Sequence, residues 1–252
     1  MARMRERRRA GRLIVPGNVP PADQTLLRQP FEELSHHADP WRVLRIMSEF
    51  VEGFEALSEV GPAVTVFGSA RTPREDPMYD RARETGAALA ARGLAVMTGG
   101  GPGIMEAVNR GAQEAGGLSI GCNIELPHEQ ALNDFVDLGI EFRYFFVRKT
   151  MFVKYARGFV IFPGGLGTLD ELFESLTLAQ TGKIDQFPVV LFGRGYWQGL
   201  LDWLGRDPLE RGIVSRDDLS LISVTDDPQE AAELAARAMP RATPAPQKAD
   251  AQ

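Results

Sequence analysis

The sequence contains one cysteine, Cys122, and three histidines, His36, His37 and His128, among its 252 residues. A single cysteine excludes an intramolecular disulfide framework and is typical of a reducing compartment, so we expect a cytoplasmic location. No CxxC or HExxH pattern occurs. Because zinc sites need several such ligands at fixed spacings, we expect no structural metal.

Long apolar runs are absent as well. No stretch approaches the roughly 18 consecutive apolar residues that cross a membrane. Residues 13–15 follow a basic start but are interrupted by Pro16 and Gly17, unlike the apolar core of a signal peptide. Apolar residues make up 44% and charged residues 25% of the chain, which is typical of a soluble globular protein and excludes a disordered or fibrous one. We therefore expect no membrane partner.

The charge is distributed unevenly along the chain. Residues 1–12 carry +5, and because the whole chain carries −6, the remaining residues carry −11. We interpret residues 1–38 as a flexible basic tail. A nucleic-acid-binding arm is the disfavoured alternative, since an acidic body repels a phosphate backbone. Residues 239–252 are rich in alanine, proline and glutamine without a hydrophobic period, which predicts a disordered tail.

We predict a single domain over residues 39–238, in which short apolar runs alternate with helical periodicity. Its first helix is expected to begin at Asp39-Pro40, because proline favours the first helical position. The apolar face of this helix is predicted from spacings of three and four, and it consists of Val43, Met47, Phe50, Phe54 and Leu57.

The later apolar runs are expected to be strands and the amphipathic stretches helices. Strands are predicted at 63–68, 94–98, 118–122, 140–145, 159–162, 189–192 and 221–224. Helices are predicted at about 78–92, 104–115, 147–157, 169–181, 196–204 and 228–238. Strands that are apolar throughout and separated by helices predict a parallel sheet covered on both faces. The expected fold is therefore a Rossmann-like, doubly wound parallel α/β sheet with helices on both faces and a helical N-terminal extension.

This topology predicts the position of a site. In a doubly wound sheet, every strand-to-helix connection emerges at the carboxyl edge. Four such connections contain residues suited to ligand binding, at 68–71, 99–103, 148–149 and 163–168. We expect these segments to meet at one crevice.

Residues 163–171 (PGGLGTLDE) form the clearest phosphate-binding pattern. Their three glycines let the backbone approach a ligand and adopt positive φ, and the amides lie at the positive end of the following helix, where anions bind. The segment lacks the Gly-Lys-Ser/Thr ending of a nucleotide-triphosphate loop, so no Mg-ATP site is expected. A structural alternative stays open, because Thr168 and Glu171 also fit a capping box with Thr168 as N-cap. Spacing alone favours the capping role for Glu171.

A second glycine turn, residues 99–106 (GGGPGIME), also follows a strand. It places Glu106 where a dinucleotide-binding fingerprint has its third glycine, and a carboxylate beside a pyrophosphate is unfavourable. A mononucleotide therefore fits better than NAD. A tight turn needed only for packing stays the alternative.

Arg148 and Lys149 follow an aromatic segment and lie at the start of a predicted helix. Cations at a helix N-terminus oppose the helix dipole. Two cations at this unfavourable position can serve to bind an anionic substrate. The alternative, which the sequence supports equally, is a solvated surface pair.

Three features occur together: glycines at 99–101 after a strand, Arg148-Lys149 before a helix, and PGGLGTLDE after the next strand. In this combination the chain resembles the LOG (Lonely Guy) family over about residues 63–224. Members of that family are cytokinin riboside 5′-monophosphate phosphoribohydrolases, formerly labelled possible lysine decarboxylases. The resemblance implies hydrolysis of the N-glycosidic bond of a purine nucleoside monophosphate such as AMP, which yields the free base and ribose 5-phosphate without a metal or organic cofactor.

The resemblance also implies site residues and partners. Arg148 and Glu171 correspond to the family's catalytic pair. Family members form homodimers whose chains share each site, and longer members form larger homo-oligomers. The N-terminal extension, the connection at 123–139 and Glu106 depart from the short members, which leaves substrate preference and oligomer size open. The implied substrate contacts are Gly100, Gly101, Glu129, Lys149, Gly164, Gly165, Leu166, Gly167, Thr168 and Thr177.

The chemistry of the residues agrees with this reaction. Cleavage of a ribosyl bond develops positive charge, which a carboxylate such as Glu171 stabilises. Arg148 could hold the phosphate or a ribose hydroxyl and position the leaving base. The alternative from another class is a non-catalytic nucleotide- or cofactor-binding carrier of Rossmann-like fold. Amino-acid decarboxylation would need a lysine in a recognisable pyridoxal phosphate setting, and no lysine of this sequence has one.

Overall fold

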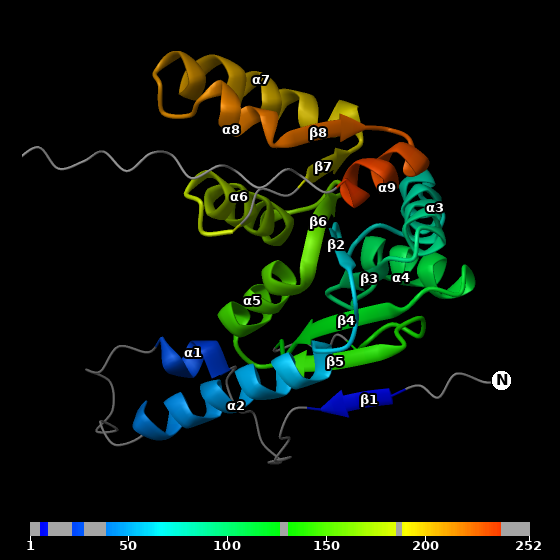
Figure 1. The fold of residues 1–252 in the computed structure, drawn as a ribbon, viewed down its shortest axis with the longest axis vertical. Helices are drawn as coiled ribbons and strands as arrows, with labels where there is room; N and C mark the ends of the chain where they lie inside the picture. Colours follow the sequence, from blue (N-terminus) through cyan, green and yellow to red (C-terminus); the bar gives the residue numbers. More distant parts are fainter. Residues whose placement is uncertain (1–5, 10–21, 28–38, 127–130, 185–187, 238–252) are drawn as a thin grey trace, which may run out of the picture.

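The computed structural model describes residues 6–9, 22–27, 39–126, 131–184 and 188–237. In these ranges, eight parallel strands form one central sheet in the order β1-β5-β4-β3-β2-β6-β7-β8 (Figure 1). The predicted Rossmann-like, doubly wound parallel α/β sheet is confirmed. The strands are β1 (Glu6–Arg9), β2 (Ala63–Phe67), β3 (Ala95–Thr98), β4 (Ser119–Ile124), β5 (Leu138–Phe142), β6 (Ala156–Ile161), β7 (Val189–Phe192) and β8 (Ile222–Thr225).

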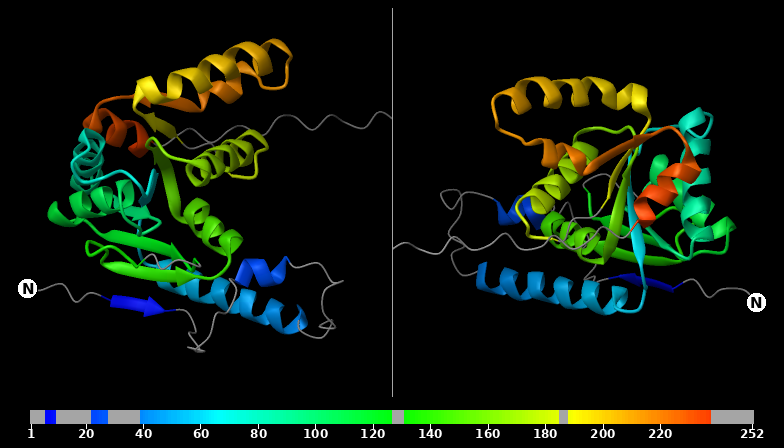
Figure 2. Two further views of the ribbon diagram at one scale, coloured as in Figure 1. Left: turned by 180° about the vertical axis from the view of Figure 1, so that it is seen from behind. Right: turned by 45° about the horizontal axis from the view of Figure 1, so that its top comes forward.

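Helices cover both faces of the sheet (Figure 2). One face carries α3 (Pro77–Ala91), α4 (Ile104–Glu114) and α9 (Pro228–Ala236). The other carries α2 (Asp39–Leu57), α5 (Phe145–Tyr155), α6 (Leu166–Gln180) and α7 (Arg194–Glu210). Two short helices, α1 (Ala22–Leu26) and α8 (Arg216–Ser220), complete the described elements. Within those elements, no helix combines the length and apolar composition that a membrane crossing requires.

The two cores are separated by the alternation of side chains along each strand. In β2, Ala63 and Phe67 belong to the core under α2, α5, α6 and α7, whereas Val64 and Val66 belong to the core under α3, α4 and α9. Successive residues of a strand point to opposite faces, so a strand buried on both sides is apolar throughout. This is the pattern from which the parallel sheet was predicted.

The strands and helices predicted after residue 39 are present, with ends that shift by a few residues. α6 begins at Leu166 instead of 169, and α7 continues to Glu210. α8 was not predicted, because its five residues RDDLS are too few to carry a helical period.

The apolar face of α2 differs in part from the prediction. Phe50 and Leu57 pack towards the core. Val43, Met47 and Phe54, expected on the same face, have exposed side chains. Both sides of this helix carry apolar residues at spacings of three and four, so the period alone could not separate them.

Part of the segment interpreted as a basic tail has regular structure. β1 pairs in parallel with β5, and α1 lies in the same segment. The sequence of β1, ERRR, has no alternation of apolar residues, so periodicity could not predict a strand there. The division into residues 1–38, 39–238 and 239–252 stays a prediction, and its last segment lies outside the described residues.

The chain changes direction across the sheet between β2 and β6. From β2 it proceeds through β3 and β4 to β5, and from β6 it proceeds through β7 to β8 on the other side. A doubly wound sheet opens a crevice at such a switch point, outside the carboxyl ends of the strands. The fold therefore places a site between the connections that follow β2 and β6.

Helices α3 and α4 approach each other closely at two glycines. A Cβ atom on Gly111 would overlap the carbonyl oxygen of Arg83, and one on Gly86 would overlap the carbonyl oxygen of Val108. Neither position has room for a side chain unless the two helices separate.

We predict that Gly111→Ala lowers the free energy of unfolding by about 1–3 kcal/mol, the usual effect of overpacking. Gly199→Ala is the control, because a Cβ at Gly199 in α7 meets no atom within 4 Å. The control should gain up to about 1 kcal/mol through helix propensity. Urea unfolding measures both variants, and equal stabilities would contradict the close contact between α3 and α4.

Candidate active site

Hydrogen bonds join the connections at the carboxyl edge of the sheet. The amide of Ser69, after β2, donates to the carbonyl of Pro163, after β6, at 3.0 Å. The amide of Ile104, at the start of α4, donates to the carbonyl of Ser69 at 3.0 Å. The predicted meeting of segments 68–71, 99–103 and 163–168 is therefore confirmed.

The glycine-rich segment after β6 leads directly into α6. Gly165 is the N-cap residue of this helix, and no side chain caps it. Gly165, Leu166 and Gly167 are exposed, and Leu166 reaches 85% exposure. The first amides of an α-helix have no acceptor within the helix and lie at the positive end of its dipole. This exposed helix start is suited to an anion.

Glycine is required at position 164 for space and not for positive φ. A Cβ there would overlap Oγ1 of Thr168. At this edge of the sheet, positive φ occurs instead at Gly100 (70°) and Gly103 (68°). The Tyr196 hydroxyl donates to the carbonyl of Gly164 at 2.6 Å, which fixes the loop from the side of α7.

The capping-box alternative for Thr168 and Glu171 is wrong. The N-cap is Gly165, three residues before the position that a capping box requires. Thr168 already lies in the first turn and donates its amide to the carbonyl of Gly165 at 3.0 Å. Thr168 and Glu171 are 7% and 6% exposed, so both side chains are buried. Glu171 is therefore available to the crevice and does not serve the helix end.

The carboxyl group of Glu171 is desolvated and surrounded by charge. Burial raises the pKa of Glu171 to about 7, although the positive charges of Lys149 and Arg148 lower it. Nζ of Lys149 lies 3.9 Å from Oε2 of Glu171. A carboxyl group with this pKa changes its protonation near neutral pH, as a general acid or base requires.

Arg148 lies in α5 with its guanidinium over two aromatic rings. The distance from Cζ to the ring centroid is 5.0 Å for Phe145 and 5.5 Å for Phe152. A Cβ on Gly99 would lie 3.8 Å from Nη1, which places the group beside the second glycine turn. Burial lowers the pKa of Arg148. The nearby charges raise it, and the largest of these contributions comes from Glu171.

One nitrogen of Arg148 has no hydrogen-bond partner. Among the buried side-chain nitrogens and oxygens of the described residues, Nε of Arg148 is the one left unpaired. Buried donors are nearly always paired in folded proteins, because an unpaired one costs the desolvation of the group. Nε of Arg148 is therefore a buried donor that the described protein groups leave without an acceptor.

Lys149 is enclosed by carboxylates of α6. Its Nζ lies 2.6 Å from Glu174 and 2.9 Å from Asp170, and its side chain is 15% exposed. Burial lowers the pKa of Lys149, but the hydrogen bonds to Glu174 and Asp170 outweigh burial and raise it. The surface-pair alternative is therefore wrong for Lys149, which ties α5 to α6 and compensates the charge around Glu171.

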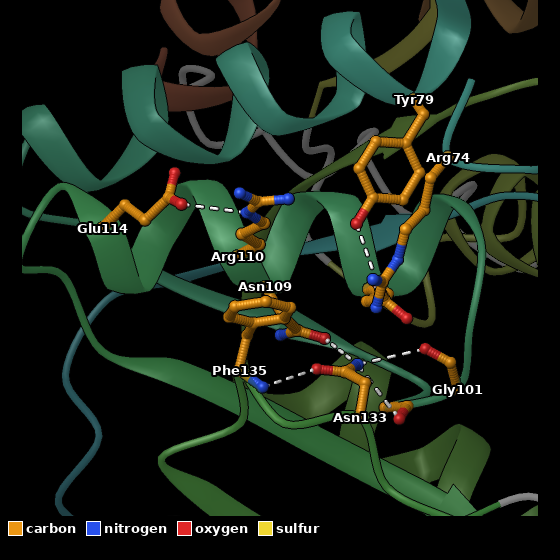
Figure 3. Close-up of polar contacts among 10 residues, drawn as sticks. Arg74, Tyr79, Gly101, Asn109, Arg110, Glu114, Asn133 and Phe135 are labelled. Atoms are coloured by element: carbon orange, nitrogen blue, oxygen red, sulfur yellow. Dashed lines mark hydrogen bonds and ion pairs between the residues drawn. The ribbon is translucent and has the colours of Figure 1, made fainter. Parts of the chain in front are cut away.

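A buried polar network fixes the second glycine turn (Figure 3). Nδ2 of Asn133 points at the carbonyls of Gly100 and Gly101, at 3.1 and 3.0 Å. The same nitrogen lies 3.0 Å from Oδ1 of Asn109, which also accepts the hydroxyl of Thr98. Neither asparagine was predicted to have a role, and the one signal in the sequence was the polar side chain of Asn109 on the apolar face of α4. Substrate contacts at Gly100 and Gly101 stay a prediction.

The charge of Glu106 is compensated at the start of α4. Its carboxylate accepts from Nε of Arg74 at 2.8 Å and from the hydroxyl of Tyr79 at 2.7 Å. Arg74 and Tyr79 converge on this point in Figure 3. The carboxylate also favours the positive end of the α4 dipole. Glu106 therefore fastens α3 and the preceding loop to α4.

Two carboxylates of the N-terminal extension hold the start of α5. Glu49 of α2, which is 5% exposed, accepts the amides of Arg143 and Tyr144 at 3.1 to 3.3 Å. Asp23 of α1 accepts the amide of Phe145 at 3.1 Å. Burial raises the pKa of Glu49, although the two backbone hydrogen bonds lower it.

These carboxylates offset the electrostatic cost expected for the cationic pair. α5 begins at Phe145, so Arg148 and Lys149 follow closely on the positive end of its dipole. Negative groups at that end are favourable, and Asp23 and Glu49 supply them from other elements. Sequence analysis missed both, because they lie far from α5 in the chain.

Thr177, Glu129 and Cys122 are the remaining residues to which the sequence drew attention. Thr177 is exposed nearly two turns beyond Glu171, and its hydroxyl donates to the carbonyl of Phe173 at 2.7 Å. Glu129 lies outside the described residues. Burial raises the pKa of Cys122 to about 12, so this thiol is not a nucleophile. The roles of Thr177 and Glu129 stay predictions.

No metal centre is formed in the part of the chain that the structure describes, where no three His, Cys, Asp or Glu side chains are placed to hold an ion. The acidic residues of α6 instead surround the ammonium group of Lys149.

Comparison with known proteins identifies the family of this chain. Residues 105–235 match the family model described as "possible lysine decarboxylase". A cytokinin riboside 5′-monophosphate phosphoribohydrolase of Mycobacterium marinum is 32% identical over 169 residues, which cover 66% of this chain and 90% of that protein. The protein of the same name from Mycobacterium tuberculosis is 32% identical over 164 residues, which cover 64% of this chain and 87% of its own.

A solved structure shares the fold. An X-ray structure determined as a structural genomics target aligns with 68% of this chain and 96% of its own, with a TM-score of 0.52 and 24% sequence identity.

The pKa of Glu171 predicts how stability depends on pH. It is about 7 in the folded protein against an ordinary value of 4.5. Between these values the folded state holds a proton that the unfolded state releases, so stability falls as the pH rises, by roughly 3 kcal/mol in total. Glu171→Gln should remove this loss, and its stability relative to wild type should increase from pH 4.5 to pH 7. Urea unfolding across this range measures the difference, and Glu210→Gln, an exposed change, should show no such trend.

The capping of α5 predicts a local effect. Glu49→Ala leaves two backbone amides without their acceptor, so the free energy of unfolding should fall by about 1–3 kcal/mol. Hydrogen exchange of residues 143–147 should accelerate. Glu59→Ala, exposed in the turn after α2, should change stability by less than about 0.5 kcal/mol. Unchanged exchange at the start of α5 in Glu49→Ala would show that the cap does not hold this helix.

Proposed function

This chain belongs to the LOG family, and from that premise we propose that it is a hydrolase of purine nucleoside 5′-monophosphates, of AMP or cytokinin type. The proposed reaction breaks the N-glycosidic bond and yields the free base and ribose 5-phosphate. The observation that carries the proposal is the unpaired Nε of Arg148, a buried cation whose charge acts on the buried carboxyl group of Glu171. Cleavage of a ribosyl bond requires an acid–base group and is helped by a fixed cation, and these two residues supply both.

The start of α6 is the proposed phosphate site. The exposed amides of residues 165–167 and the end of the helix dipole favour an anion there. Thr168, in the same turn, is a further proposed contact, and Gly164 gives the loop the space it needs. Binding energy from the phosphate would then hold the ribose in the geometry that reacts.

Glu171 and Arg148 are the proposed catalytic residues. As the bond from the ribose carbon to the base nitrogen breaks, positive charge develops on the ribose, and the Glu171 carboxylate stabilises it. The oxygen of a water molecule forms the new bond to that carbon. One hydrogen of the water stays in the new ribose hydroxyl, and the other passes as a proton through the Glu171 carboxylate to the departing base. Arg148 directs its unpaired nitrogen to an oxygen of the substrate and fixes its position.

The remaining predicted contacts belong to the same proposal. Lys149 keeps the charge around Glu171 balanced and lies beside the sugar site. We include Gly100, Gly101, Glu129 and Thr177 as substrate contacts. The reaction needs no metal or organic cofactor.

We further propose that the protein acts in the cytoplasm as a homo-oligomer whose chains share each site. Apolar side chains next to the crevice support this. Leu166 is 85% exposed, Phe145 and Phe146 are 40% exposed, and Phe173 is 38% exposed. Exposed apolar groups that cluster on one side of a protein are typical of an interface.

Release of adenine and ribose 5-phosphate from AMP by the purified protein tests the reaction. Glu171→Gln and Arg148→Ala should each lower kcat at least about a hundredfold, the usual loss for one catalytic group. Glu174→Gln is the matched control, since it removes a neighbour of Lys149 and keeps the catalytic carboxyl group. We expect its kcat to stay within about tenfold of wild type, as for loss of an indirect contact.

A panel of AMP, GMP, CMP and isopentenyl-AMP identifies the base. Wild-type turnover in both catalytic variants would contradict the assigned roles. Nucleotide that raises the melting temperature without release of base from any substrate would favour the carrier alternative.

A further inference from the structure

Helix α2 carries an apolar stripe on the side that faces away from the protein. Trp41, Leu44, Met47, Val51 and Phe54 are 66%, 54%, 56%, 63% and 36% exposed. Their spacing of three and four residues keeps them on one side of the helix. α2 runs along one end of the molecule, with α5 on its inner side (Figures 1 and 2). The opposite side of α2 already packs on α5 and β5. The stripe is therefore a second apolar face, which the described elements leave exposed except at Phe54, where Lys154 of α5 lies over the ring.

Apart from Asp39 at its first position, the charges near the two ends of α2 are arranged against its dipole. Arg42 and Arg45 lie in the first half of the helix, and Glu52 and Glu55 lie in the second half. The macrodipole favours the opposite arrangement, with acids first and bases last. An antiparallel neighbour with the same sequence relieves this conflict, because it brings an acidic half against a basic half.

The apolar and charged positions agree on one register. A twofold axis at the level of residue 49 places Met47 level with Val51 of a second copy and Leu44 level with its Phe54. The same axis brings Arg45 to within one residue of the level of Glu52 on the other chain. Arg45 and Glu52 lie on the same flank of the stripe, since seven residues make nearly two turns. A self-complementary patch of this kind is what a twofold symmetric interface requires.

We propose that α2 pairs in an antiparallel manner with α2 of a second copy of this chain. This inference rests on the homo-oligomer part of the proposed function, for which it names a contact surface, and it does not depend on the proposed reaction. A membrane surface fits less well, because α2 carries four acidic residues, Asp39, Glu49, Glu52 and Glu55, against two arginines, and interfacial helices are rich in basic residues.

The paired surface continues towards the catalytic helix. The ring of Phe50 lies 5.8 Å from that of Phe54, at the edge of the stripe, and 6.5 Å from that of Phe146 in α5. Phe145 and Phe146 are 40% exposed, so they extend the apolar area beyond α2. This extension matters because a stable interface buries about 800 Å² on each partner, more than one short helix offers.

A cysteine cross-link tests the face directly. Cys122 is buried, so it does not compete. Ser48→Cys places a thiol close to the twofold axis, and mild oxidation should convert most of this variant to a disulfide-linked dimer. Ser58→Cys, exposed near the end of the helix and far from the axis, should stay uncrosslinked under the same conditions. Equal cross-linking of both variants, or none of either, would overturn the proposal.

Charge reversal tests the register. Arg45→Glu and Glu52→Arg should each raise the dissociation constant of the assembly about tenfold, since each change turns two attractive contacts into repulsive ones. The double variant, and an equimolar mixture of the two single variants, should both regain wild-type affinity. Val51→Asp should reduce the molar mass by light scattering, with an unchanged circular dichroism spectrum. An assembly that keeps its mass in all these variants, or a wild-type protein that is monomeric at all concentrations, would show that α2 does not pair.

Discussion

Arg148 and Glu171 carry opposite charges, are both buried and act on each other electrostatically, and the cost of burying them is the constraint on which this site depends. Burial shifts the pKa of each group towards its neutral form, and each charge opposes the shift of the other. Either charge alone would be expensive to bury, since an unpaired ion loses its hydration without compensation. The two residues come from different helices, α5 and α6, so the site exists only while both helix starts are held at the carboxyl edge of the sheet.

Each helix start is held by a different device. α6 begins on bare glycine backbone, with the carbonyl of Gly164 bonded by Tyr196 and no capping side chain. That arrangement leaves the first amides exposed to an anion. α5 is capped by carboxylates from the N-terminal extension, Asp23 and Glu49. Lys149 then joins the two helices through Asp170 and Glu174. The extension is thus part of the scaffold of the site and not an addition to it.

Local patterns in the sequence predicted the fold and the neighbourhood of the site, because strand burial and helix periodicity act over a few residues. The topology rule then brought the glycine segments to one edge. The predicted capping role of Glu171 was wrong because α6 begins three residues earlier than predicted. Residue propensities do not locate the end of a helix that closely. Glu49 and Asn133 could not be predicted, since their partners lie 94 and 33 residues away and no local pattern records such pairings.

The site stores unfavourable free energy that a ligand can release. Nε of Arg148 is buried without an acceptor from the described protein groups, and Glu171 is held where its ionised form is disfavoured. Both conditions lower the stability of the protein by itself, and both improve when an oxygen reaches the guanidinium and a cationic centre develops beside the carboxylate. A reaction is accelerated by interactions that are weak before the substrate binds and strong as its bond breaks. Interactions formed only in the transition state lower the barrier. In the proposed reaction, the cost of burying these two groups and their use in ribosyl cleavage therefore have one physical origin.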